Sequence, residues 1–278
     1  MTELPPFPSL PGLDGLPGLP ALPTMGPALR RPPASGARRQ WRPAVVTTLH
    51  DETATARTFR LRIEAGDGET VDRHVPGQHY DIRLTAPDGS TAQRSYSIAS
   101  APARPPQDGR EVELTVERIE QGEVSPYLHD DIAVGDQVEL RGPFGGWFIW
   151  RGDTPVLLLG GGSGVVPLMA MRRYWHDTGE EAPLRLLISV RRPEDLYYQG
   201  SYGPETTVIH TRQAPAGDPR PAGRLTAADV EPLLAALPDD RIVYICGSAG
   251  FAEYASQVVV ELGVPAAQVR IERFGPGA

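Results

Sequence analysis

The chain of 278 residues is 40% hydrophobic, which is enough to bury a sizeable core and favours two domains. Its formal net charge of −8 argues against a nucleic-acid-binding surface, because such surfaces are basic. All 27 basic residues are arginines, so Schiff-base and P-loop lysine chemistry are excluded. Cys246 is the single cysteine, which excludes a disulfide within the chain and a cysteine-ligated iron–sulfur cluster. The six histidines show no metal-ligand spacing.

Residues 1–38 contain ten of the thirty prolines, in repeats such as Leu16-Pro17-Gly18-Leu19-Pro20. Proline removes a backbone donor and fixes φ, so neither helix nor sheet propagates there. We predict a disordered Pro/Gly/Leu-rich arm with polyproline II character, either a docking arm for a partner or a dispensable tail. The chain shows no run of eighteen apolar residues and no secretory leader pattern, so a cytoplasmic location is expected.

Alternating polar and apolar residues predict a first domain over residues 39–150. Six strands separated by turn signals, with no long helical pattern between them, predict a small antiparallel β-barrel. The expected strands are Arg42–Leu49, Ala56–Ile63, Gln78–Leu84, Thr91–Ile98, Glu111–Ile119 and Gln137–Arg141. One short helix is expected over Ser125–Asp130, with Ser125 as N-cap and Pro126 at the first helical position. Its free N–H groups are expected to form an anion site.

Residues 151–278 change to alternating buried strands and helices, which predicts a parallel α/β domain with the boundary near Trp150. The expected strands are Val156–Leu159, Leu184–Val190, Thr206–His210, Arg241–Ile245 and Val269–Glu272. The expected helices are Val166–His176, Thr226–Ala236 and Phe251–Leu262.

The strand around Arg94 carries an arginine, an aromatic residue and two hydroxyls at close spacing. Period-two geometry puts Arg94, Tyr96 and Ile98 on one face and Ser95 and Ser97 on the other. Arginine pairs phosphate in a fork, and tyrosine offers a ring face and a hydroxyl. The strand therefore predicts a flat, phosphorylated cofactor; an ordinary exposed strand is the alternative.

A glycine-rich turn, Gly160–Pro167, follows the apolar run Val156–Leu159 and precedes a helical pattern. Such a turn lets the backbone approach a pyrophosphate at a helix N-terminus, although Pro167 stands where the dinucleotide fingerprint has its third glycine. At the end of the next strand, where an acid would read a ribose 2′-hydroxyl, the sequence has Arg191-Arg192. Arginine there favours a 2′-phosphate and hence NADPH over NADH; two exposed arginines opening a loop are the alternative.

Cys246-Gly247-Ser248 ends a further strand at its carboxyl edge, where ligands of open α/β sheets bind. The cysteine is either a core residue or a group placed near a nicotinamide ring. No hydrolase triad is evident, because the glycines around Ser163 do not form the G-x-S-x-G pattern.

These motifs together resemble the ferredoxin–NADP reductase superfamily, in its bacterial oxygenase-reductase branch, over roughly residues 41–278. The resemblance is carried by Pro76-Gly77-Gln78, Arg94-Ser95-Tyr96-Ser97, Gly122-Glu123-Val124-Ser125, Gly142-Pro143-Phe144-Gly145, the glycine turn, Cys246-Gly247-Ser248 and Glu272-Arg273-Phe274-Gly275. All occur in the order typical of that superfamily.

The resemblance implies that Arg94 pairs a flavin pyrophosphate, Tyr96 packs against the isoalloxazine and Ser97 hydrogen-bonds near N5. It implies further flavin contacts at Ser95, Val116, Arg118, Gly122, Val124 and Ser125. It implies nicotinamide-nucleotide contacts at Gly161, Gly162, Ser163 and Gly247, and a 2′-phosphate contact at Arg191, with Arg212 and Arg224 as further candidates. Cys246 would lie near the nicotinamide, and Glu272 with Phe274 would close the other side of the flavin. The expected catalytic residues are Ser97, Cys246 and Glu272.

The resemblance implies an oxidoreductase that takes hydride from NADPH, or NADH, onto FAD and passes single electrons to a separate acceptor. FAD is expected rather than FMN because most of the branch uses it. The acceptor would be a ferredoxin or an oxygenase component, and an arginine patch could dock it: Arg38, Arg39, Arg42, Arg172 and Arg173. Two alternatives are a flavin- and dinucleotide-binding sensor without turnover, and a non-flavin dinucleotide-binding protein whose barrel mediates assembly.

Overall fold

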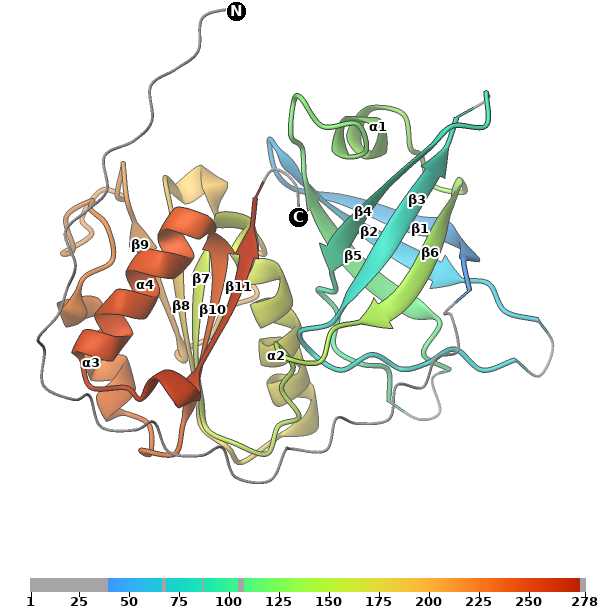
Figure 1. Cartoon of the computed structure of the whole chain (residues 1–278). Helices are drawn as coiled ribbons and strands as arrows, with labels where there is room; N and C mark the ends of the chain where they lie inside the picture. Colours follow the sequence, from blue (N-terminus) through green and yellow to red (C-terminus); the bar gives the residue numbers. More distant parts are fainter. Residues whose placement is uncertain (1–39, 67–68, 87, 105–107, 276–278) are drawn as a thin grey trace, which may run out of the picture. The chain divides into compact units, whose positions relative to one another are not determined.

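The computed structural model describes residues 40–66, 69–86, 88–104 and 108–275 (Figure 1). The predicted arm, residues 1–38, lies outside the described residues. A six-stranded antiparallel sheet followed by a five-stranded parallel sheet confirms the predicted fold class. Within the described ranges, no helix is long and apolar enough to cross a membrane. The division of the chain near residue 150 stays a prediction.

The first sheet has the strand order β4-β3-β6-β1-β2-β5 and is antiparallel throughout. Its strands are β1 (Arg42–Thr53), β2 (Ala56–Ile63), β3 (His79–Thr85), β4 (Thr91–Ser97), β5 (Glu111–Glu117) and β6 (Gln137–Phe144). A bridge between Ile98, just past β4, and Leu114 on β5 joins the two edges. The sheet therefore curves until its edges meet, as expected for a barrel.

Strand β2 shows how the sequence pattern fills this barrel. Phe59, Leu61 and Ile63 point inward and are at most 2% exposed, whereas Arg60 and Arg62 point to solvent. Because side chains alternate between the two faces of a strand, one face of β2 supplies the barrel core, and the other carries the exposed Arg60 and Arg62 together with the buried Ala56 and Thr58.

The second sheet is parallel and has the order β11-β10-β7-β8-β9. Its strands are β7 (Val156–Gly161), β8 (Leu184–Val190), β9 (Thr206–His210), β10 (Ile242–Ser248) and β11 (Val269–Phe274). The main helices are α2 (Val165–Thr178), α3 (Ala227–Ala235) and α4 (Ala249–Glu261), and short 3-10 turns occupy 162–164, 193–195 and 266–268.

Both faces of the parallel sheet are covered, as its continuous apolar strands require (Figure 1). On β7, Val156 and Leu158 pack in the same cluster as residues of α2, whereas Leu157 and Leu159 pack with residues of α3 and α4. All four side chains are fully buried. This double burial holds the carboxyl edge of β7, where the glycine turn begins, in one position.

The predicted capping role of Ser125 is wrong. Helix α1 (Ser125–Asp130) has Val124 at its N-cap position, with no side-chain cap. The hydroxyl of Ser125 accepts a hydrogen bond from the backbone N–H of Ile119 at 3.0 Å instead. The hydroxyl therefore closes the preceding loop rather than the helix end.

Several predicted strand ends also shift. β5 ends at Glu117 rather than Ile119, and β11 continues to Phe274 because it stays paired with β10 as far as Ser248. β6 continues to Phe144, which pairs with His79 on β3, so the Gly-Pro step at 142–143 lies inside the strand. Sequence patterns missed this extension because glycine and proline usually end strands.

One buried ion pair joins α2 to the segment before β9. Arg172 Nε lies 2.5 Å from Glu205 Oε1, and the two side chains are 9% and 7% exposed. The same carboxylate oxygen accepts hydrogen bonds from the Gly203 N–H and the Thr206 hydroxyl. Removing the arginine would leave a buried carboxylate without its counter-charge.

We therefore expect Arg172→Ala to lower the free energy of unfolding by about 3–5 kcal/mol. The control is Glu194→Ala, which removes an exposed pair with Arg192 at 3.7 Å and should cost less than about 1 kcal/mol. Urea denaturation of both variants measures the difference. Equal losses would show that the Arg172–Glu205 pair contributes no more than a surface pair.

Candidate functional site

The parallel sheet reverses its strand order at β7, and this marks the first half of the candidate site. β8 and β9 lie on one side of β7, and β10 and β11 lie on the other. Ligands of open α/β sheets bind beyond the carboxyl ends of the strands at such a reversal. There Gly160 on β7 pairs with Cys246 on β10. The glycine turn and Cys246-Gly247-Ser248, far apart in sequence, therefore meet at the expected edge.

Different physical constraints act at the individual glycines of the turn. A Cβ on Gly164 would lie 2.1 Å from the backbone oxygen of Cys246, and one on Gly161 would lie 2.5 Å from the ring of Phe251. Gly162 has φ +55°, and nothing lies within 4 Å of a Cβ built on it. Gly162 thus borders open space, whereas Gly161 and Gly164 make room for protein.

Cys246 is completely buried, and its neighbour across the β10–β11 ladder is Glu272. Burial raises the pKa of the Cys246 thiol well above its usual value, and the nearby Glu272 carboxylate raises it further. The thiol therefore stays protonated near neutral pH and is a poor nucleophile. Its packing with residues of α2 makes it a core side chain at the edge of the site.

Glu272 carries an unpartnered polar atom at this edge. Its Oε2 is buried and has no hydrogen-bond partner among the described residues. Burial raises the pKa of the carboxyl to about 7. A buried polar atom without a partner is costly, and this oxygen is therefore available to hydrogen-bond a group bound at this edge.

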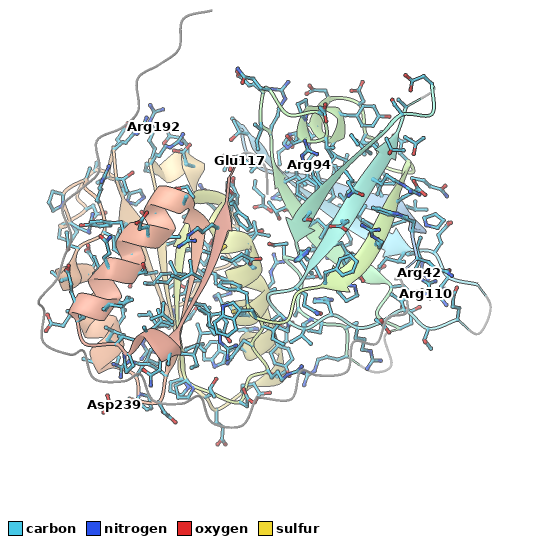
Figure 2. All side chains as sticks on the ribbon, in the orientation of Figure 1. Arg42, Arg94, Arg110, Glu117, Arg192 and Asp239 are labelled. Atoms are coloured by element: carbon cyan, nitrogen blue, oxygen red, sulfur yellow. The ribbon has the colours of Figure 1, made fainter. Side chains whose placement is uncertain are left out.

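Strand β4 forms the second half of the candidate site. Arg94 is half exposed; its Nη1 donates to the Gln93 carbonyl, and its Nη2 lies 3.6 Å from a carboxylate oxygen of Glu123 (Figure 2). Tyr96 packs against the barrel core, and burial raises the pKa of its hydroxyl. Ser97 is 7% exposed. The Ser95 hydroxyl donates to Asp81 on β3 at 2.7 Å, so this hydroxyl already has a protein partner.

The predicted flavin contacts on β5 and α1 divide into core and surface residues. Val116 and Val124 are at most 1% exposed, so their side chains belong to the barrel core and only their backbones can contact a ligand. Arg118 pairs with Asp130 at 2.8 Å. Gly122 donates its N–H to the Ile119 carbonyl, and Ser125 is buried against the same loop.

Two of the predicted phosphate-binding arginines lie together. Arg191 follows β8, and its carbonyl accepts a hydrogen bond of 2.9 Å from the Arg212 N–H, just past β9. Both side chains are exposed. Arg224 is also exposed, with its carbonyl bonded to the side chain of Arg220. The structure thus brings Arg191 and Arg212 to one sheet edge, where their two guanidinium groups can bind an anion.

The remaining predicted residues lie at the same carboxyl edge. Gly247 follows Cys246 on β10, and a Cβ there would lie 2.8 Å from the Phe251 ring. Phe274 pairs with Ser248 at the end of β11 and is partly buried against the α2-side core. Ser163 lies within the glycine turn and is partly exposed.

The expected arginine docking patch does not form as predicted. Arg172 is buried against Glu205, and Arg173 pairs with Glu113 at 2.6 Å. Arg42 pairs with Glu69. These charges are neutralised by neighbouring carboxylates, and Arg38 and Arg39 lie outside the described residues.

Two family models match the two sheets in order. Residues 43–149 match an oxidoreductase FAD-binding domain, and residues 158–257 match an oxidoreductase NAD-binding domain. The chain belongs to the ferredoxin–NADP reductase superfamily. Its two domains make it an FAD-dependent NAD(P)H oxidoreductase, with FAD and a pyridine nucleotide as cofactors.

Curated relatives are larger than the matched region. The glycine betaine monooxygenase reductase subunit of Chromohalobacter salexigens is 30% identical over 225 residues, covering 77% of this chain and 51% of that protein. A flavohemoprotein of Vibrio cholerae is 30% identical over 267 residues, covering 90% and 63%. The chain therefore spans about half to three fifths of the length of these relatives.

Among solved structures, the flavohem-like FAD/NAD-binding domain of nitric oxide dioxygenase from Vibrio cholerae is similar over nearly its whole length. The TM-score is 0.73 at 27% identity, with 84% of this chain and 99% of that chain covered. The similarity thus extends over both sheets of the reductase fold.

The residues present fit these cofactors. The Arg94 guanidinium is 47% exposed, and its carboxylate neighbour Glu123 lies 3.6 Å away and is itself 75% exposed, so a phosphate can displace this weak surface pair. Gly162 faces open space, and Glu272 has an unpartnered oxygen. These are the features that a phosphorylated, hydrogen-bonding ligand would use.

Phe251 is a residue that the sequence interpretation missed. Its ring lies over Gly161 and Gly247 and so shapes the floor of the nucleotide edge. Its N–H donates to the hydroxyl of Ser248, the N-cap of α4, at 3.3 Å. An aromatic residue three positions after this serine was the available signal, because capping geometry fixes where that side chain begins.

The raised pKa of Glu272 predicts a pH-dependent stability. The folded pKa of about 7 exceeds the ordinary 4.5, so its contribution is fully present below pH 4.5 and is lost as the pH rises to 7. Ionisation of Glu272 should therefore lower the free energy of unfolding by about 3 kcal/mol as the pH rises from 4.5 to 7.

Glu272→Gln provides the comparison, because an amide of the same shape does not titrate. The difference in unfolding free energy between the parent protein and Glu272→Gln, both without added cofactor, should change across this pH range. A difference that is constant with pH would contradict the raised pKa.

Proposed function

We propose that this protein takes a hydride from NADPH onto bound FAD and passes electrons singly to a separate acceptor. Bound FAD would supply the redox chemistry, since a flavin can take two electrons and one proton as hydride from the nicotinamide and release the electrons one at a time. The protein supplies binding, orientation and electrostatics.

The observation that carries the proposal is the meeting of Gly160, Cys246 and Glu272 on three neighbouring strands at the sheet reversal. There a buried thiol and a carboxyl with an unpartnered oxygen border the glycine turn. This arrangement suits an uncharged, flat nicotinamide ring that needs hydrogen-bond partners at its rim.

On the barrel side, we propose that Arg94 pairs the flavin pyrophosphate, that Tyr96 lies against the flavin ring and that Ser97 hydrogen-bonds at its edge. The half-exposed Arg94 guanidinium supports the first role, and the packed Tyr96 ring supports the second. The backbones of Gly122, Val124 and Ser125 would provide further donors. Glu272 and Phe274 would border the flavin from β11.

We propose that the acceptor is an oxygenase component or a small ferredoxin. The similarity to a monooxygenase reductase subunit supports this choice. The second candidate function is that of a flavohemoprotein, because the similarity to the flavohemoprotein of Vibrio cholerae covers 90% of this chain. A sensor without turnover remains the alternative that the following experiment separates.

The test is an anaerobic titration of the full chain, loaded with FAD, with NADPH and then with NADH, while the visible spectrum is recorded. Bleaching of the yellow protein, followed by recovery of colour on adding the one-electron acceptor ferricyanide, is expected. A yellow protein that neither nucleotide bleaches would support the sensor. Failure to bind FAD would overturn the roles given to Arg94 and Tyr96.

We further propose that Arg191, with Arg212 beside it, selects NADPH. Arg191→Ala should raise the KM for NADPH about tenfold or more and change the KM for NADH by less than about twofold, since the forked contact is made to the 2′-phosphate. Arg185→Ala, near the opposite end of β8, is the control and should change neither. Equal increases for both nucleotides in Arg191→Ala would show that this arginine does not read the phosphate.

A further inference from the structure

The loop between β8 and β9, residues 191–205, contains a residue that the proposed function does not use. Tyr198 has a φ of +56° and is the one non-glycine residue with positive φ in the described part of the chain. Its side chain is 3% exposed. A bulky residue keeps the left-handed conformation only where its surroundings hold it there.

Those surroundings belong to the barrel. The Tyr198 backbone N–H donates to Glu52 Oε2 on β1 at 2.8 Å, and its hydroxyl donates to Thr115 Oγ1 on β5 at 2.7 Å. Thr58 Oγ1 on β2 lies 2.7 Å from Thr115 Oγ1 and donates to Glu52 Oε1 at 2.6 Å. Because the Thr58 proton goes to Glu52, Thr115 donates to Thr58.

These bonds form a closed ring that begins and ends at Tyr198. The hydroxyl of Tyr198 donates to Thr115, Thr115 to Thr58 and Thr58 to Glu52, which also accepts the Tyr198 N–H. Thr58 and Thr115 are buried, at 7% and 5% exposure. Every hydroxyl in the ring has one donor and one acceptor role, except the terminal Tyr198, which only donates. A buried chain of this kind holds its members in a single arrangement.

The same tyrosine lies beside the helix that follows the glycine turn. The guanidinium of Arg173 on α2 lies 5.0 Å from the centre of the Tyr198 ring. Arg173 Nη1 also donates to Glu113 on β5 at 2.6 Å and to the Ala99 carbonyl, two residues past Ser97, at 3.0 Å. Tyr198 is therefore packed where the glycine-turn helix meets the barrel.

The residue after Tyr198 joins this part of the loop to the start of the loop. The Gln199 side chain donates to the Pro193 carbonyl at 3.1 Å, directly after Arg191 and Arg192. The segment that begins with the proposed phosphate-reading arginine is thus tied at its middle to β1, β2 and β5.

We propose that Tyr198 is a positioning residue for hydride transfer, which fixes the nucleotide-reading loop against the flavin-binding barrel. This inference rests on the proposed function. Hydride transfer needs the two reacting atoms in near contact, and misplacement by about 1 Å costs on the order of a hundredfold in rate. A nucleotide held by Arg191 and the glycine turn is correctly placed only if both are fixed relative to the barrel.

The test compares Tyr198→Phe with Tyr202→Phe, both as the FAD-loaded full chain. Tyr202 is a matched control, because its hydroxyl donates at 2.7 Å to the Tyr197 carbonyl within the same loop. Rapid mixing with NADPH under anaerobic conditions gives the limiting rate of flavin bleaching and the apparent Kd separately. Tyr198→Phe should lower the limiting rate about tenfold, with the apparent Kd and flavin content within about twofold, and Tyr202→Phe should change neither.

A second readout does not depend on turnover. Amide hydrogen exchange across residues 191–202 of the FAD-loaded protein, without nucleotide, should be faster in Tyr198→Phe than in the parent protein. Thr115→Val removes the acceptor from the barrel side and should produce the same effects, with the double variant no worse than either single one.

An unchanged limiting rate in a flavin-loaded Tyr198→Phe protein would overturn the proposal, as would an equal loss in Tyr202→Phe. Unchanged amide exchange in Tyr198→Phe would also contradict it. If instead the parent protein itself is not bleached by NADPH, the proposed function fails, and amide exchange still decides whether Tyr198 fixes the loop.

Discussion

Close approach of two backbones at the sheet reversal is the constraint on which the nucleotide half of the molecule depends. Gly164 lies so near the Cys246 carbonyl that no side chain fits between them. That contact sets the glycine turn against β10, and the β10–β11 ladder then places Glu272 beside Cys246. The turn, the thiol and the carboxyl come to one edge because a glycine permits the approach.

The glycines at this edge differ in whether protein atoms fill the space beside them. Phe251 fills the room left by Gly161 and Gly247, and Gly162 leaves room that nothing else occupies. Packing therefore requires most of the glycines in this turn. Gly162 alone among them borders open space, which is where the proposed nucleotide would approach.

The arginines show a similar division of roles. Some are used in ion pairs that hold elements together, such as Arg172 with Glu205 and Arg173 with Glu113. Others, such as Arg94 and Arg191, remain exposed at the two halves of the candidate site. In a chain with a net charge of −8 and no lysine, exposed arginines such as these are the cations available to anionic cofactors.

The sequence by itself determined the order of the two sheets, the Arg94–Ser97 strand, the glycine turn and the arginines after β8. These features are local, because neighbouring residues determine the period of a strand, the type of a turn and the start of a helix. Domain type and cofactor class follow from their order along the chain.

Tertiary structure alone decided which polar side chains lack a hydrogen-bond or ion-pair partner and which are held in place by one. The bonds from Tyr198 to Thr115 and Glu52 join residues 83 and 146 positions apart. The unpartnered oxygen of Glu272 and the neutralised charge of Arg173 also depend on distant neighbours. No local pattern encodes such contacts, since burial and pairing are properties of the packed chain and not of any one segment.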